Sequence, residues 1–208
     1  MNNADYKKIL KNIPNVNRYI LRYLFEDLKI KHKDNTLWLE FGVFSGKTIN
    51  YISKFTDKKV YGFDSFLGLP EDWIIGFPKG TFSRNGNLPK VNDNVTLISG
   101  WFEDTLEIFS KYKNEKVSFI HIDSDIYSSA KYILNTLKNS IDKGCIIVFD
   151  ELVNYPGYDG ETGELRALCE FIEENNVKYE WIGMNGKIEM FNPAYENEAV
   201  AIKILEIN

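Results

Sequence analysis

Two short apolar runs early in the sequence are each followed by residues that could bind a nucleoside-bearing cofactor. The first run carries Glu40 and leads into a turn bracketed by Gly42 and Gly46. Glycines there permit backbone angles that other residues avoid, and they let a ligand approach closely. The second run, Val60–Phe63, ends at Asp64, an acid suited to accepting hydrogen bonds from ribose hydroxyls. A strand, a glycine loop, a helix, a second strand and an acid are the layout of a cofactor site in an α/β fold.

Three cofactor classes compete for this loop. A Walker-type phosphate loop requires G-x-x-x-x-G-K-[ST]; Gly46-Lys47-Thr48 supplies its end, but Phe41 stands where the first glycine belongs. A dinucleotide loop requires G-x-G-x-x-G, and bulky Val43 or Phe44 replaces its middle glycine. The pattern E-x-G-x-x-x-G resembles instead the loop of class I methyltransferases that use S-adenosylmethionine, where no phosphate is bound and larger residues fit. The sequence favours this third class, although a single Gly-x-x-x-Gly also occurs in purely structural turns.

Carboxylates follow two further apolar runs and indicate a cation site. One run ends at Asp123, and Asp125 stands two residues beyond it; the other, Cys145–Phe149, is followed by Asp150 and Glu151. The carboxyl ends of parallel strands face the ligand crevice, so these acids are expected to lie near one another. Several carboxylates together are stabilised by a cation or a proton, and hard oxygen ligands suit Mg²⁺. The alternative is that the first acid after each run caps the helix that follows.

The composition limits the kind of protein. A length of 208 residues suits one domain with a full-sized core. The net charge is −5 and no basic stripe stands out, so nucleic acid is not an expected partner. No apolar run approaches the ~20 residues of a membrane span, so no membrane association is expected. The two cysteines, Cys145 and Cys169, lie in apolar settings and predict a reduced, cytoplasmic protein.

The N-terminal region is predicted to be helical. Residues 1–34 form this segment, which packs on a main domain of residues 35–208. Its apolar side chains recur at three- and four-residue spacing, at Val16, Tyr19, Ile20, Tyr23, Leu24 and Leu28. The segment is expected either to lie beside the cofactor cleft or to form part of a homo-oligomer contact.

Hydrophobic spacing also predicts the elements that position the acids. A loop of about thirty residues follows Asp64, and its aromatic residues form either a substrate wall or lid, or a satellite hydrophobic cluster under the loop. Helices are expected from about Thr105, from Ala130 to Ile141 with Gly144 as the terminator, and from Leu165 to Ile172. Further strands are expected at Val95–Ser99, Tyr179–Gly183 and Ala199–Ile207, with a short strand or hairpin arm at Gly186–Phe191.

With these motifs in order, the sequence resembles the macrocin O-methyltransferase-like group of class I S-adenosylmethionine-dependent methyltransferases. The resemblance covers about Leu37 to Met184. Its motifs are Glu40–Gly46, Gly62–Pro70, Gly80–Phe82, Gly100–Thr105, His121–Ser129, Phe149–Glu151 and Asn154–Gly157. It implies an α/β, Rossmann-like fold: a seven-stranded, mostly parallel sheet with helices on both faces and one antiparallel strand near the end.

The resemblance also implies a divalent metal held by Asp123, Asp150 and Glu151. Many relatives have Asp-Asp or Asp-Asn as the last pair, so Glu151 departs from the pattern. The residues expected to bind S-adenosylmethionine are Glu40, Gly42, Phe44, Gly46, Asp64, Ser65, Gly100, Trp101, Phe102 and Asp123. Within this set, the glutamate and the first glycine hold the amino-acid end, Asp64 the ribose and Trp101 the adenine.

The expected reaction is metal-dependent O-methylation of a small-molecule hydroxyl of sugar or natural-product type. Mg²⁺ or another divalent cation would orient the acceptor oxygens and lower the pKa of a hydroxyl. Asp123 or Asp125 would take the proton. Two alternatives stay open: a metal-free methyltransferase that acts on an amine or carboxylate, and a non-catalytic module that binds an adenosyl cofactor.

Overall fold

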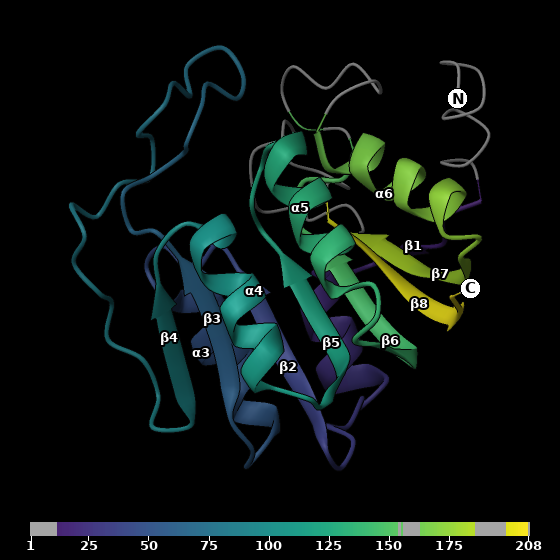
Figure 1. The fold of residues 1–208 in the computed structure, drawn as a ribbon. Helices are drawn as coiled ribbons and strands as arrows, with labels where there is room; N and C mark the ends of the chain where they lie inside the picture. The colour runs from purple at the N-terminus through teal and green to yellow at the C-terminus, as the bar shows by residue number, and fades with distance from the viewer. Residues whose placement is uncertain (1–11, 154, 156–162, 186–198, 208) are drawn as a thin grey trace.

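The structure, a computed structural model, describes residues 12–153, 155, 163–185 and 199–207. Within these residues one eight-stranded sheet has the order β1-β7-β8-β6-β5-β2-β3-β4 (Figure 1). The strands are β1 Asn15–Val16, β2 Thr36–Phe41, β3 Val60–Asp64, β4 Val95–Ser99, β5 Lys116–Ile122, β6 Ile141–Phe149, β7 Lys178–Asn185 and β8 Val200–Glu206. Strand β8 runs antiparallel to β6 and β7, and the other neighbouring strands are parallel. The predicted Rossmann-like α/β fold, with its antiparallel strand near the end, is confirmed.

Helices cover both faces of this sheet. On one face lie α4, α5 and α6, and on the other lie α3 and residues 16–30 of the N-terminal segment (Figure 1). The helices are α2 Ile20–Arg22, α3 Lys47–Ile52, α4 Phe102–Tyr112, α5 Tyr127–Leu137 and α6 Gly163–Glu174, with a π-helical turn at Tyr23–Asp27 and a 3₁₀ turn at Ser53–Phe55. None of the described helices is long and apolar enough to cross a membrane.

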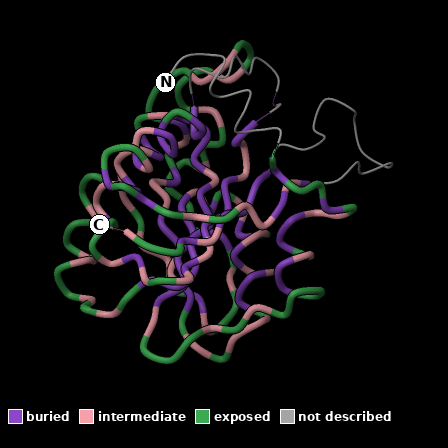
Figure 2. Tube along the Cα trace, turned by 90° about the vertical axis from the view of Figure 1, so that its right-hand side faces the viewer, coloured by how far each residue is buried: buried purple, intermediate pink, exposed green. Residues whose placement is uncertain are grey.

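The central strands are buried on both faces, as their unbroken apolar runs predict. Side chains alternate along each strand, so Trp38 and Phe119 enter the core under the N-terminal segment, and Leu39 and Ile120 enter the core under α4–α6. Figure 2 shows the resulting buried centre. This alternation also decides the direction of each polar side chain near the carboxyl ends of the strands.

The N-terminal segment differs from the predicted helix. Val16 belongs to the two-residue strand β1, which pairs with β7 and is the eighth strand of the sheet. The Met184 N–H donates to the carbonyl of Pro14 at 2.8 Å, and a Cβ at Gly183 would lie 2.7 Å from Val16, so only glycine permits this approach. Residues 20–27 are helical as predicted, but Leu28 is 47% exposed and lies outside the buried stripe. Residues 1–11 lie outside the described residues.

The prediction that the helix after Asp125 runs to Ile141 and is ended by Gly144 is wrong. Helix α5 ends at Leu137, and both Ile141 and Gly144 lie in β6. The pairing of β6 with β5 shifts register between Val117 and Phe119, and Gly144 has a φ of +82° within the irregular stretch. The expected arm at Gly186–Phe191 lies outside the described residues.

Candidate active site

A cavity of about 240 Å³ opens at the carboxyl ends of the parallel strands. The cavity is lined by Gly42, Phe44, Asp64, Ser65, Gly68, Leu69, Pro70, Phe82, Gly100, Trp101, Phe102, Glu103, Asp123, Ser124, Asp125, Ser129 and Glu151. Most of the predicted cofactor residues are therefore in its wall. Three predicted site residues are not: Glu40, Gly46 and Asp150.

The glycine loop lies directly against the end of β5. Gly42 has a φ of +90°, and a Cβ there would lie 1.7 Å from the carbonyl oxygen of Asp123. The Asp123 N–H in turn donates to the Phe41 carbonyl at 2.8 Å, which fixes the two strand ends together. Gly46, with a φ of +79°, precedes the first residue of α3 and directs the chain into that helix. Gly42 therefore shapes the cavity, whereas Gly46 shapes the turn beneath it.

Asp64 is held by three backbone donors. Its Oδ2 accepts hydrogen bonds from the N–H groups of Val43 at 2.9 Å and Phe44 at 2.7 Å, and its Oδ1 accepts one from Phe66 at 2.6 Å. The side chain thus joins the glycine loop to the start of the loop after β3. A carboxylate offers about four lone pairs, so these bonds leave acceptor capacity for ribose hydroxyls. That role stays a prediction.

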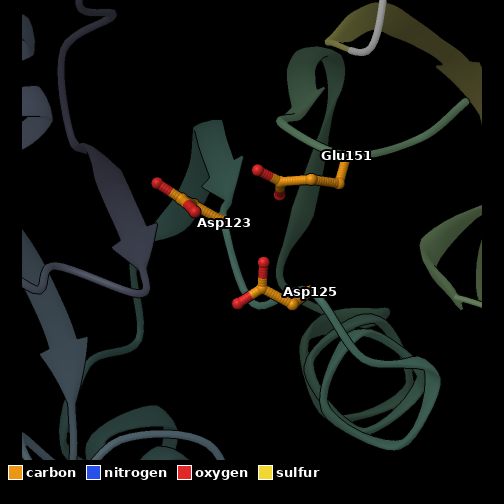
Figure 3. Close-up of side chains that lie close together, drawn as sticks. All are labelled: Asp123, Asp125 and Glu151. Carbon is orange, nitrogen blue, oxygen red and sulfur yellow. The ribbon is translucent and has the colours of Figure 1, made fainter. Parts of the chain in front are cut away.

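Three carboxylates converge at the acidic end of the cavity. One oxygen from each of Asp123, Asp125 and Glu151 lies within 4.8 Å of the others, and the side chains of Asp125 and Glu151 extend toward Asp123 (Figure 3). Asp125 has a φ of +63°, which turns it back toward Asp123. Oε2 of Glu151 is buried and has no hydrogen-bond partner. Carboxylate oxygens this close together can hold a divalent cation.

The electrostatics of these acids reflect their burial. Desolvation, followed by the negative charge of Asp150, raises the pKa of Asp123 well above its usual value. The same two causes raise the pKa of Asp125 to about 7. Burial also raises the pKa of Glu151 well above its usual value. A bound cation or shared protons would relieve this repulsion.

The side chain of Asp150 does not line the cavity and instead contacts Tyr19 and His121. Its Oδ1 accepts a hydrogen bond from the Tyr19 hydroxyl at 3.0 Å and lies 3.4 Å from Nε2 of His121. Asp150 and Glu151 both lie just beyond β6, which ends at Phe149, but only Glu151 lines the cavity. The three carboxylates that lie close together therefore include Asp125 and not the predicted Asp150.

Glu40 and His121 form a buried pair behind the cavity. Glu40 is fully buried, and its Oε2 lies 3.6 Å from Nδ1 of His121. Burial alone would lower the pKa of His121, but the carboxylates of Asp150 and Glu40 raise it well above its usual value. Burial alone would raise the pKa of Asp150, but His121 lowers it. His121 is therefore a hydrogen-bonded core group, and Glu40 does not reach the cavity wall.

Glu164 is a buried acid that the sequence analysis missed. It lies in the first turn of α6, and its Oε1 is 3.3 Å from the Ser124 N–H. Burial, followed by the charge of Asp125, raises its pKa to about 8. Acids are favoured at helix N-termini, but this weak signal does not reveal that α6 begins against the turn between Asp123 and Asp125.

The long loop between β3 and β4 supplies aromatic residues to the other side of the cavity. Phe82 packs edge-on against Phe44 with ring centroids 5.7 Å apart, and Phe77 lies 5.7 Å from Phe82. Trp73 contacts both Phe77 and Tyr155. The loop therefore lines the cavity through Phe82 and forms an aromatic cluster behind it, and its contact with a substrate stays a prediction.

Comparison with known proteins identifies the fold and the family. A family model described as a methyltransferase domain matches residues 39–152, more than half of the chain. The calicheamicin methyltransferase CalS11 has a TM-score of 0.58 at 18% identity, over 81% of this chain and 72% of that one. The O-methyltransferase NovP has a TM-score of 0.56 at 19% identity, over 82% and 72% of the two chains. None of the curated proteins compared with the sequence matches it.

A third structure matches over nearly the whole chain. It is the O-methyltransferase from Bacillus cereus in complex with SAH, with a TM-score of 0.56 at 15% identity, over 99% of this chain and 92% of that one. The matched family region contains the glycine loop, Asp64 and all three converging acids. The chain therefore belongs to the methyltransferase domain family and has the fold of S-adenosylmethionine-dependent methyltransferases.

Proposed function

We propose that this protein transfers the methyl group of S-adenosylmethionine to a hydroxyl of a small molecule. The observation that carries the proposal is the composition of the cavity, where a glycine loop with Asp64 faces a group of three carboxylates. The first part suits a nucleoside-bearing methyl donor, and the second suits activation of an acceptor. The structural neighbours named as O-methyltransferases support the choice of a hydroxyl. Membership in the macrocin O-methyltransferase-like group is part of this proposal and rests on the sequence motifs.

The residues present fit the donor. Gly42 brings backbone against the cavity without a side chain, and Asp64 offers acceptor oxygens at the end of β3. Trp101 and Phe102 add apolar surface suited to an adenine. Glu40 is too deeply buried to touch the donor, so we assign it an indirect effect through His121 and the strand ends.

The residues also fit a divalent cation. Asp123, Asp125 and Glu151 would hold it, and the unpartnered Oε2 of Glu151 is a free ligand atom. When bound, the cation would orient acceptor oxygens and lower the pKa of the reacting hydroxyl. Methyl transfer forms an O–CH₃ bond, breaks the S–CH₃ bond with its electron pair retained on sulfur, and releases the hydroxyl proton. We assign Asp125, which lines the cavity beside Asp123, as the group that accepts this proton.

Calorimetry with three ligands tests the donor. We expect S-adenosylhomocysteine to bind, and ATP with Mg²⁺ and NAD not to bind comparably. ATP binding without S-adenosylhomocysteine binding would instead identify the loop around Gly46 as a phosphate site. If S-adenosylhomocysteine binds but no acceptor in a broad panel is methylated, the non-catalytic alternative gains support.

An acceptor panel with and without chelator tests the reaction. We expect methylation of sugar or phenol hydroxyls that is lost in excess chelator and restored by Mg²⁺. Transfer to an amine or carboxylate that persists in chelator would support the metal-free alternative. In that case the three acids would bind and deprotonate the acceptor directly.

A further inference from the structure

A row of polar side chains lies on one face of the sheet, between the sheet and the N-terminal segment that covers this face. Glu40 on β2 and His121 on β5 are register partners, so their side chains share this face. Asp150 follows β6, two residues beyond Val148, which packs under the same segment. His121 lies between the two carboxylates, 3.6 Å from Glu40 and 3.4 Å from Asp150. The row ends at the Tyr19 hydroxyl, which donates to Asp150.

Tyr19 is firmly placed by its neighbours in sequence. Ile20 and Leu21 are fully buried, and the Ile20 N–H donates to Oδ1 of Asn185 at 2.7 Å. The hydroxyl itself is buried among acids, and burial with the charge of Asp150 raises the pKa of Tyr19 well above its usual value, so it remains a donor. The N-terminal segment therefore holds one O–H group in a fixed position against Asp150.

The two donors meet at one oxygen of Asp150. Oδ1 accepts from Tyr19 and lies 3.4 Å from Nε2 of His121, and these two contacts fix the orientation of the carboxylate. Asp150 adjoins Glu151 in sequence, and its charge acts on both Asp123 and Asp125. Groups that orient a carboxylate near a cation commonly change cation affinity when they are removed.

We propose that Tyr19 is a positioning residue that fixes Asp150 beside the Asp123–Asp125–Glu151 cluster, so that the N-terminal segment forms part of the cation site. This inference rests on the divalent-cation part of the proposed function. It gives the N-terminal segment a role in cation binding, in addition to its packing against the sheet.

Mn²⁺ binding followed by electron paramagnetic resonance, without donor or acceptor, tests the inference. Tyr19→Phe keeps the ring and removes only the hydroxyl, and we expect it to weaken Mn²⁺ binding roughly ten- to a hundredfold. Tyr23→Phe is the matched control, because within the described chain its hydroxyl makes no hydrogen bond. S-adenosylhomocysteine affinity should stay unchanged in both variants, and both should remain folded in a thermal melt.

A second comparison separates positioning from general structure. In an Asp150→Asn background, Tyr19→Phe should cause little further loss of Mn²⁺ binding, because the two residues act through one bond. Four outcomes would each overturn the inference. Two concern Mn²⁺ affinity in the single variants: no change in Tyr19→Phe, or an equal loss in Tyr23→Phe. The other two are additive losses in the double variant, and a loss of fold or of S-adenosylhomocysteine binding in Tyr19→Phe. A wild type that binds S-adenosylhomocysteine but no Mn²⁺ would overturn it together with the cation part of the proposed function, while methyl transfer itself would stand.

Discussion

The carboxylate of Asp64 accepts a hydrogen bond from the Phe44 N–H at 2.7 Å, so the acid that ends β3 holds the tip of the glycine loop. The same oxygen accepts from Val43 at 2.9 Å. Asp64 therefore shapes the donor half of the cavity before any ligand binds. Its effect on affinity should combine loop order with any direct contact to a ribose.

Asp64→Ala should weaken S-adenosylhomocysteine binding by ~1–3 kcal/mol, since hydrogen bonds to a charged group are lost. Asp64→Asn should have a smaller effect, because it keeps one acceptor oxygen for the loop. Calorimetry measures both, with Asp93→Ala, an exposed acid before β4, as the control. Equal affinities for wild type and Asp64→Ala would remove Asp64 from the donor site.

Gly42→Ala should be severely disruptive. A Cβ there would lie 1.7 Å from a backbone oxygen at a φ of +90°, so two strand ends must separate. We expect a loss of about 3 kcal/mol or more in the free energy of unfolding, together with loss of S-adenosylhomocysteine binding. Gly76→Ala is the matched control, because its φ is +92° but nothing lies within 4 Å of its Cβ. Urea unfolding should give roughly 1–2 kcal/mol for the control; a similar cost at both positions would contradict the close packing of Gly42.

Asp123→Asn should stabilise the metal-free protein while abolishing methyl transfer. The folded-state pKa of Asp123 is raised by burial and by Asp150, so its ionisation opposes folding as the pH rises above the unfolded value of 3.8. The gain should be on the order of 1 kcal/mol at pH 8 and should shrink as the pH falls toward 4. Thermal melts at both pH values in chelator measure this. A variant less stable than wild type at pH 8 would show that Asp123 is well compensated in the fold.

Glu170→Gln should destabilise the contact between α5 and α6. Glu170 accepts from Lys131 at 2.7 Å and from Arg166 at 2.9 Å, and these bonds lower its pKa to about 2 against the opposing effect of burial. A lowered pKa stabilises the fold above pH 4.5, and this stability is lost as the pH falls toward 2. We expect a cost of about 1 kcal/mol at pH 7, given the partial exposure of the group, and almost none near pH 2. Glu173→Gln, at an exposed position of the same helix, is the control in urea unfolding and should leave the free energy of unfolding at pH 7 nearly unchanged.

Local sequence was sufficient for the framework of the cavity. The apolar runs predicted β2, β3, β5 and the later part of β6, because a strand buried on both faces admits few polar residues. Gly42 was identifiable for a similar reason, since its conformation and close contact exclude a side chain. Most of the residues predicted to bind the methyl donor therefore line the cavity.

Tertiary structure decided which acids meet. Asp125 joins Asp123 because a left-handed turn reverses the chain, and Asp150 leaves the group because it points to the face that Tyr19 covers. Residue type does not encode either direction. Glu164 is likewise brought to the site only by the packing of α6 against the end of β5.

The structure of the N-terminal segment also depends on contacts with residues far away in the sequence. Its spacing predicted a helix through Val16, but the edge of β7 offers unpaired backbone groups, and β1 satisfies them. That pairing depends on a strand far along the chain and on the missing side chain of Gly183. The sequence by itself determined which residues could do chemistry and which strands carry them, and the tertiary structure decided their directions and partners, because these depend on turns and contacts between distant segments.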